Sequence, residues 1–269
     1  MERGKVIVEK VGGKSTVTKC FSKYPLKFII PRKVGSSETD AVWIYTITYG
    51  GGIVSVYKAV GSKSSEQVLE ARIGSNAFLA VIPDPVTCFS TAKYSQRQVF
   101  KVVSDSSVLL VDWITSGRHE RGEKWDFDLY KSTNHIFHNG DEPLFLDTIL
   151  LEQGTHAGIA ERMQDYQVIA MVILLGPKLK LIQNQIQEDV KKMMSRSLHM
   201  PTIGSRQNSN RHNDHCLTKP SFVASCSIFG PKGVGVVTRI AAMTTESVYN
   251  FLQHQLSSME PLLGVKPYS

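Results

Sequence analysis

Short runs of β-branched and aromatic residues, separated by turn residues, restrict this chain to a small set of folds. The runs cover residues 42–49, 68–73, 98–103, 108–114, 145–151 and 167–175, and a closing hairpin is expected over 223–241. Trp125, Phe127 and Leu129 alternate with polar residues, which predicts a further strand over 125–130. Because such side chains fit a pleated surface, the pattern predicts an all-β (mainly β) sandwich, barrel or solenoid.

Two segments have helical spacing instead. Apolar residues recur every three or four positions along 181–198 and again along 245–260, which predicts two helices. Thr244 is suited to cap the second helix, and Pro261 is expected to end it. Strands and helices do not alternate, so a doubly wound nucleotide-binding fold is excluded.

The size and composition of the chain are those of a globular protein. It has 269 residues, 42% of them hydrophobic, so it can bury a core without disulfides. We expect one domain over 1–269, with the polar stretch 199–220 as a flexible loop. The four cysteines lack CxxC spacing, and no apolar run could cross a bilayer. A reducing, cytoplasmic setting without a membrane partner is therefore expected.

The chain is basic, with 31 Lys and Arg against 24 Asp and Glu, a net charge of +7. The basic residues are scattered and form no dense or aromatic strip, which argues against a nucleic-acid partner. A solvated basic face and a surface for a protein partner both stay open.

Two segments are candidates for function on composition alone. In residues 116–125 (SGRHERGEKW), two glycines bracket a group of mostly ionisable residues. This segment is either a charged hairpin tip or a binding tip in which Arg118 and Glu123 are partly buried and paired. The second segment contains four possible weak metal-capture residues: His212, Asp214, His215 and Cys216. Their spacing is too compressed for a four-ligand site, so a plain polar loop is the alternative.

In their order and number, several motifs resemble the urease accessory protein D family, most of all its land-plant members. The motif residues are Tyr24 to Lys27, Tyr49 to Ser55 with Gly50, Gly51 and Gly52, Pro83 to Val86, Ser116, Gly117, Arg118, Gly122, Glu123, Trp125, Leu146, Asp147 and Gly230 to Gly233. The likeness extends from about Ser22 to the C-terminus, and no single motif carries it alone.

The resemblance implies a flattened, helix-like stack of β-sheets with a helical pair, and a role without catalysis. It implies binding to urease accessory protein F, through which accessory protein G joins, and docking on apo-urease. Nickel would then pass transiently through a polar channel, with no cofactor held tightly. Gly117, Arg118, Gly122 and Glu123 would form the family turn, and Glu123 and Asp147 would be polar interior residues on the channel path.

The chain departs from the family pattern after Ser55, where Val56 follows at once. A segment on the order of two dozen residues, enough for two or three strands, is expected to be missing there. We expect this loss to leave strand edges open, so that the chain folds poorly or fails to activate urease. The alternatives are a harmlessly shortened hairpin and, for the function, a β-rich carbohydrate-active enzyme with paired carboxylates.

Overall fold

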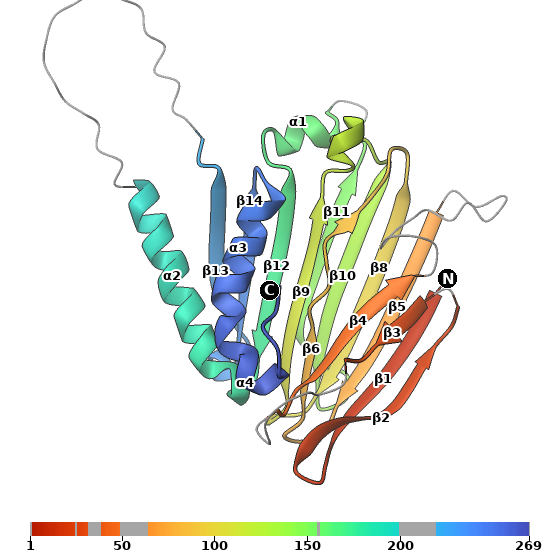
Figure 1. Ribbon diagram of the computed structural model, residues 1–269, viewed down its shortest axis with the longest axis vertical. Helices are drawn as coiled ribbons and strands as arrows, with labels where there is room; N and C mark the ends of the chain where they lie inside the picture. Colours follow the sequence, from red (N-terminus) through yellow and green to blue (C-terminus); the bar gives the residue numbers. More distant parts are fainter. Residues whose placement is uncertain are drawn as a thin grey trace, which may run out of the picture.

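The computed structural model describes residues 2–24, 26–31, 39–48, 64–154, 157–198 and 219–268. Two β-sheets face each other, and two long helices lie over the outer face of one of them (Figure 1). Several sequence predictions lie outside the described residues, namely Gly50, Gly51, Gly52, the Ser55–Val56 junction, His212, Asp214, His215, Cys216 and almost all of the loop 199–220. In the described part of the chain, no helix is both long and apolar enough to cross a membrane.

Within the described residues, the first sheet has six strands and the second has eight. The first contains β1 (Glu2–Val11), β2 (Lys14–Ser22), β5 (Ser64–Ile73), β8 (Lys93–Val102), β10 (Leu129–His138) and β11 (Glu142–Glu152). The second contains β3 (Leu26–Ile29), β4 (Val42–Thr48), β6 (Phe78–Val81), β7 (Val86–Thr87), β9 (Ser107–Thr115), β12 (Val168–Leu175), β13 (Phe222–Phe229) and β14 (Gly235–Ala242). The helical segments are η1 (His119–Arg121), α1 (Ile159–Met163), η2 (Pro177–Leu179), α2 (Lys180–Leu198), η3 (Pro231–Gly233), α3 (Thr245–Leu256), η4 (Ser257–Met259) and α4 (Glu260–Leu263).

The chain passes repeatedly from one sheet to the other, as a flattened helix of strands. The strand order is β11-β10-β8-β5-β1-β2 in the first sheet and β13-β14-β12-β9-β6-β4-β3 in the second, with β7 beside β9. Strands β5, β8 and β10 are parallel neighbours because the chain visits the second sheet between them. A strand of the opposite sheet thus serves as the crossover that parallel pairing requires. The expected mainly β, helix-like stack is confirmed.

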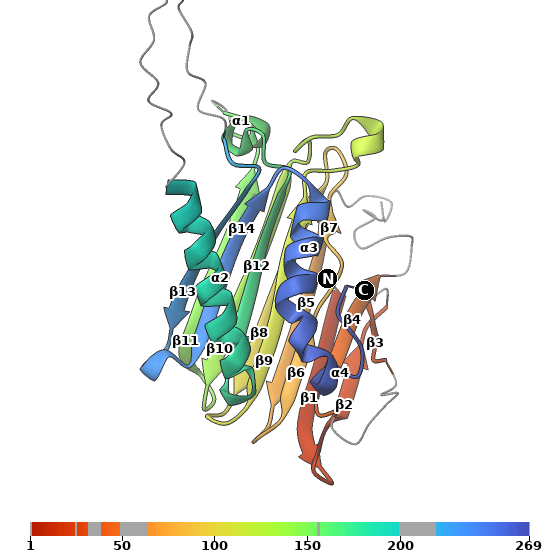
Figure 2. The same cartoon turned by 60° about the vertical axis from the view of Figure 1, so that its left-hand side comes forward.

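The central strands β6, β9 and β12 of the second sheet are buried on both faces, which explains why they are apolar. In β12, Met171 and Ile173 pack between the sheets, whereas Val172 and Leu174 pack beneath α2 and α3. A strand buried on both sides is expected to be apolar throughout instead of alternating. Figure 2 shows α2 and α3 side by side over β12, β13 and β14.

The two predicted helices are present, but the end of the second one differs. α2 covers the first prediction, and the side chain of Thr244 accepts a hydrogen bond from the Ser247 amide at the start of α3. α3 ends at Leu256, and η4 and α4 follow it. Pro261 does not end the helical region, because it lies in the first turn of α4, where its missing N–H costs nothing.

The strand predicted over 125–130 is wrong for most of its length. Trp125 and Phe127 are buried and Asp126 is exposed, so the alternation is real, but β10 begins only at Leu129. Trp125 has a φ of 60°, in the left-handed region, which is incompatible with a paired strand. Tyr130, which the pattern placed on the polar face, is buried instead.

Candidate functional site

The glycine-bracketed segment forms a compact turn at one end of the sandwich. Gly117 has a φ of 141°, and a Cβ there would lie 2.9 Å from the Cβ of Glu123. Gly122 ends η1 in the left-handed conformation. The Trp125 amide donates to the carbonyl of Ser116 at 2.6 Å, which closes the turn. Glycine is required at both positions because a side chain would be strained or would clash.

Arg118 and Glu123 pair within this turn. The Arg118 Nε donates to Glu123 Oε2 at 2.9 Å, and the Nη2 contacts Oε1, so the guanidinium binds both carboxylate oxygens. The Arg118 guanidinium also lies 4.0 Å from the centre of the Phe89 ring. Hydrogen bonding to Arg118 lowers the pKa of Glu123 to about 2. Glu123 is therefore held as a carboxylate, which is unsuited to the general acid of a glycosidase.

A polar layer crosses the interior of the sandwich, and Asp112 of β9 is its centre. Asp112 is 3% exposed and accepts hydrogen bonds from four side chains of the first sheet. The donors and distances are Gln96 Nε2 at 2.7 Å and Tyr130 Oη at 3.4 Å to Oδ1, and Ser132 Oγ at 2.5 Å and Asn134 Nδ2 at 2.6 Å to Oδ2. Gln96 in turn accepts from Tyr94, which extends the layer toward β5.

The burial of Asp112 makes its charge costly. Full burial raises the pKa of Asp112, and the hydrogen bonds from Ser132, Asn134 and Gln96 only partly oppose this effect. An ionised carboxylate in such a place is stabilised by a nearby cation, and a protonated one would itself become a donor. A cation that entered the polar layer would therefore favour the ionised form of Asp112.

Two oxygens of the layer have no donor. Asn134 Oδ1 and Asp147 Oδ2 are buried, and no described residue donates a hydrogen bond to either. Asn134 of β10 and Asp147 of β11 are paired across the two strands, so their side chains are neighbours on one face. A cation or a water between them would satisfy both oxygens. Toward the solvent, Arg239 Nη2 donates to Asp147 Oδ1 at 2.7 Å.

The two carboxylates that the resemblance suggested are not brought together. Asp147 lies on the inward face of β11, whereas Glu123 lies in the end turn, and no hydrogen bond or ion pair among the described residues joins them. An apolar cluster that includes Trp125, Phe127 and Tyr130 occupies this end of the sandwich. Within the described ranges, no three His, Cys, Asp or Glu side chains are grouped closely enough to hold a metal ion.

Sequence reasoning missed Asp112 and Asn134. Asp112 is the one charged residue in the otherwise apolar run 108–114, and a lone charge in such a run is a signal that could have found it. Asn134 has no comparable signal, because only the packing of the two sheets places it beside Asp112, and only strand pairing places it beside Asp147.

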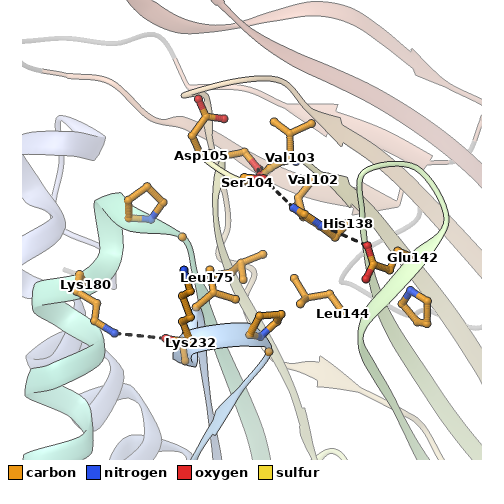
Figure 3. A pocket seen from close by; sticks show the side chains of 18 residues that line it. Val102, Val103, Ser104, Asp105, His138, Glu142, Leu144, Leu175, Lys180 and Lys232 are labelled. Atoms are coloured by element: carbon orange, nitrogen blue, oxygen red, sulfur yellow. Dashed lines mark hydrogen bonds and ion pairs between the residues drawn. The ribbon is translucent and has the colours of Figure 1, made fainter.

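A cavity of about 1030 Å³ opens at the opposite end of the sandwich, where three inter-strand turns and the connection from β12 to α2 meet (Figure 3). Val102, Leu144 and Leu175 line it, together with the 230–233 turn that the resemblance singled out. Ser104 Oγ lies 3.0 Å from His138 Nε2, and His138 Nδ1 lies 3.7 Å from Glu142 Oε2. The distance between His138 and Glu142 is too long for the hydrogen bond that orients a catalytic histidine. Ser104, His138 and Glu142 therefore do not match a hydrolase triad.

Comparison with known proteins decides the family. The model of the family described as UreD urease accessory protein matches residues 55–269. The chain belongs to the UreD family. The urease accessory protein D of Arabidopsis thaliana is 58% identical, with all of both chains covered. The protein of that name from Oryza sativa subsp. indica is 54% identical over 98% of this chain and 94% of its own. The UreD of the bacterium Sorangium cellulosum is 28% identical over 99% and 83%. The chain is thus a plant-like UreD member.

The comparison also bears on the expected missing segment. The alignment with the Arabidopsis UreD relative spans 294 positions and all 269 residues of this chain. At least 25 of its positions therefore have no residue in this chain. The UreD family match begins at residue 55, next to the expected junction.

Proposed function

We propose that this chain is a non-catalytic scaffold in urease maturation that helps deliver nickel to apo-urease in the cytoplasm. Its partners in this proposal are accessory protein F, accessory protein G through F, and apo-urease itself. Nickel is the cargo and is bound only in transit. Family membership supports the link to urease, and the polar layer supports the transit of a cation.

The donor set of the layer suits a passing divalent ion. It offers carboxylate, amide and hydroxyl oxygens from Asp112, Asp147, Asn134 and Ser132. Such oxygens hold a borderline metal more weakly than thiolates do, so the ion can be released. Asn134 Oδ1 and Asp147 Oδ2, which lack donors, are the observation that carries the proposal.

The guanidinium of Arg239 lies at the solvent-facing side of the polar layer. Arg239 is 47% exposed at its side chain and pairs with Asp147. A divalent ion that reaches Asp147 must take the place of the guanidinium, since like charges repel. The exposed side of Arg239 allows it to turn toward solvent, after which Asp147 and Asn134 can contact the ion.

The test is urease activation in cells that coexpress this chain, urease, and accessory proteins F and G. Asp112→Asn and Asp147→Asn are each expected to lower activation by about tenfold or more, because they remove the charge that attracts the ion. The matched control is Asp165→Asn, since Asp165 is exposed and outside the layer. Full activation by both layer variants would contradict the proposal.

Thermal melting separates this effect from misfolding. At neutral pH, Asp112→Asn is expected to melt at or above the temperature of the parent chain. The raised pKa of Asp112 means that its ionised form destabilises the fold, and this cost grows as pH rises above its ordinary range. The Asn134 amide can flip so that its Oδ1 accepts a hydrogen bond from the side-chain amide introduced at position 112.

A second candidate function follows from the positions of the Arabidopsis alignment that have no residue in this chain. The shortened chain would bind the same partners without activating urease. The 25 or more alignment positions without a residue in this chain support this candidate, because the loss of one segment of that length would exceed an ordinary loop.

A further inference from the structure

The outer face of the first sheet takes no part in the site described above. Strands β1, β5, β8 and β10 are parallel neighbours in this sheet. Parallel sheets are usually covered on both faces. Here the inner face packs on the second sheet, and α2 and α3 lie beyond that second sheet (Figures 1 and 2). The side chains of Lys5, Arg72 and Arg97 are exposed on the outer face.

A hollow of about 270 Å³ lies in this face. Its charged lining residues are Lys5, Glu70, Arg72, Arg97, Lys101 and Asp141. Strand register places these residues together, since Lys5 pairs with Glu70 across β1 and β5, and Arg72 pairs with Lys101 across β5 and β8. The sheet therefore holds Arg72 and Lys101 side by side, and Arg97 lies four residues before Lys101 on β8.

The charges around the hollow do not balance. Four cations face two carboxylates, and Lys101 is paired with Asp141 at 2.7 Å. Among the described residues, no carboxylate oxygen lies within 4.0 Å of a nitrogen of Lys5, Arg72 or Arg97. The pKa of the nearby His135 is lowered, chiefly by burial. The positive charge of Arg97 is the second cause. The hollow is thus a place of positive potential.

Exposed apolar side chains flank the hollow on the same face. Leu146 and Leu150 of β11 are 56% and 51% exposed, and Leu146 is paired with outward-facing His135. Phe137 lines the hollow itself. Leucines beside a cationic hollow suit a protein segment better than a phosphate polymer, which would favour a dense basic strip with stacking aromatics.

We propose that this face binds an acidic segment of a partner protein. Its Asp or Glu carboxylates enter the hollow and pair with Arg72 and Arg97, and its apolar side chains pack on Leu146 and Leu150. A guanidinium binds a carboxylate through two hydrogen bonds, so Arg72 and Arg97, which both line the hollow, favour this group over a neutral one. No residue of the polar layer takes part, so this surface stands independently of nickel transfer.

Fluorescence anisotropy with a labelled Glu-Glu-Leu repeat peptide tests the proposal, with a Lys-Lys-Leu repeat peptide as the charge-reversed control. The intact chain is expected to bind only the acidic peptide. The double variant Arg72→Gln with Arg97→Gln is expected to bind it at least about tenfold more weakly. The control pair Lys14→Gln with Lys191→Gln removes the same charge from exposed sites elsewhere and is expected to change binding by less than about twofold.

Three results would overturn the proposal. One is no binding of the acidic peptide by the intact chain, and another is an equal loss in the two double variants. The third is displacement of the peptide by polyphosphate that itself binds more tightly, which would assign the hollow to a phosphate polymer. A further variant, Leu146→Asp, keeps both arginines and is expected to weaken binding by repelling the peptide. Melting curves of all variants confirm that the fold is intact.

Discussion

The Arg118 guanidinium contacts both carboxylate oxygens of Glu123, and this geometry has a consequence for acid stability. The pKa of Glu123 is lowered from 4.5 to about 2, chiefly by the hydrogen bonds from Arg118. A lowered pKa in the folded state means that the pair stabilises the fold above about pH 4.5 and loses this effect as pH falls toward 2.

Glu123→Gln is expected to lower urease activation without unfolding the protein, because the turn keeps its glycines and most of its backbone bonds. The melting temperature of the parent chain should exceed that of the variant above pH 4.5, and the difference should shrink as pH falls toward 2. Melting curves between pH 2 and 7 measure this difference. Full urease activation by the variant would show that the pair has no role in activation. A difference in melting temperature that does not change with pH would rule out the electrostatic explanation.

Among the elements, the described sheets end at two strands with exposed apolar side chains. β2 is the last strand of the first sheet and β3 is the last strand of the second. Phe21 of β2 is 61% exposed and Ile29 of β3 is 42% exposed, and Tyr24 between the two strands is 73% exposed. Apolar strand edges of this kind promote association between copies.

The double variant Phe21→Lys with Ile29→Lys is therefore expected to raise the monomer fraction in size-exclusion chromatography with light scattering. Exposed substitutions of this type change stability by less than about 0.5 kcal/mol, so any gain comes from the edge and not from the core. Leu181→Lys is the matched control, since Leu181 is 85% exposed on α2. An equal gain from the control would show that general surface charge is responsible.

At the scale of the whole molecule, at least 25 positions of the alignment with the Arabidopsis relative have no residue in this chain, and this loss predicts weaker activity. Coexpression with accessory protein F, followed by size exclusion, is expected to show whether a soluble complex forms. In the presence of urease and accessory protein G, activation is expected to fall below that of the Arabidopsis relative, because the expected loss of strands would leave sheet edges open. Equal activation by the two proteins would refute this expectation and favour a harmlessly shortened hairpin.

The sequence by itself determined the mainly β fold class, most of the long elements and the family. Periodicity located α2, α3 and the strands β4, β5, β8, β9, β11, β12, β13 and β14, because burial of one or both faces leaves a pattern in consecutive residues. It did not mark β1, β2, β3, β6 or β7. The order of the motifs identified the family, and Gly117 and Gly122 marked a turn whose backbone favours glycine. The strand over 125–130 failed because alternating burial does not require hydrogen-bonded pairing.

Only the tertiary structure decided which polar residues meet. Asp112, Asn134 and Asp147 come from three strands, and Arg72 and Arg97 come from two others. Their neighbours are set by strand register across sheets, which depends on contacts between distant parts of the chain. The spacing of residues along the sequence does not show which strands pair or in which register. The polar layer and the cationic hollow could therefore be recognised only in the three-dimensional structure.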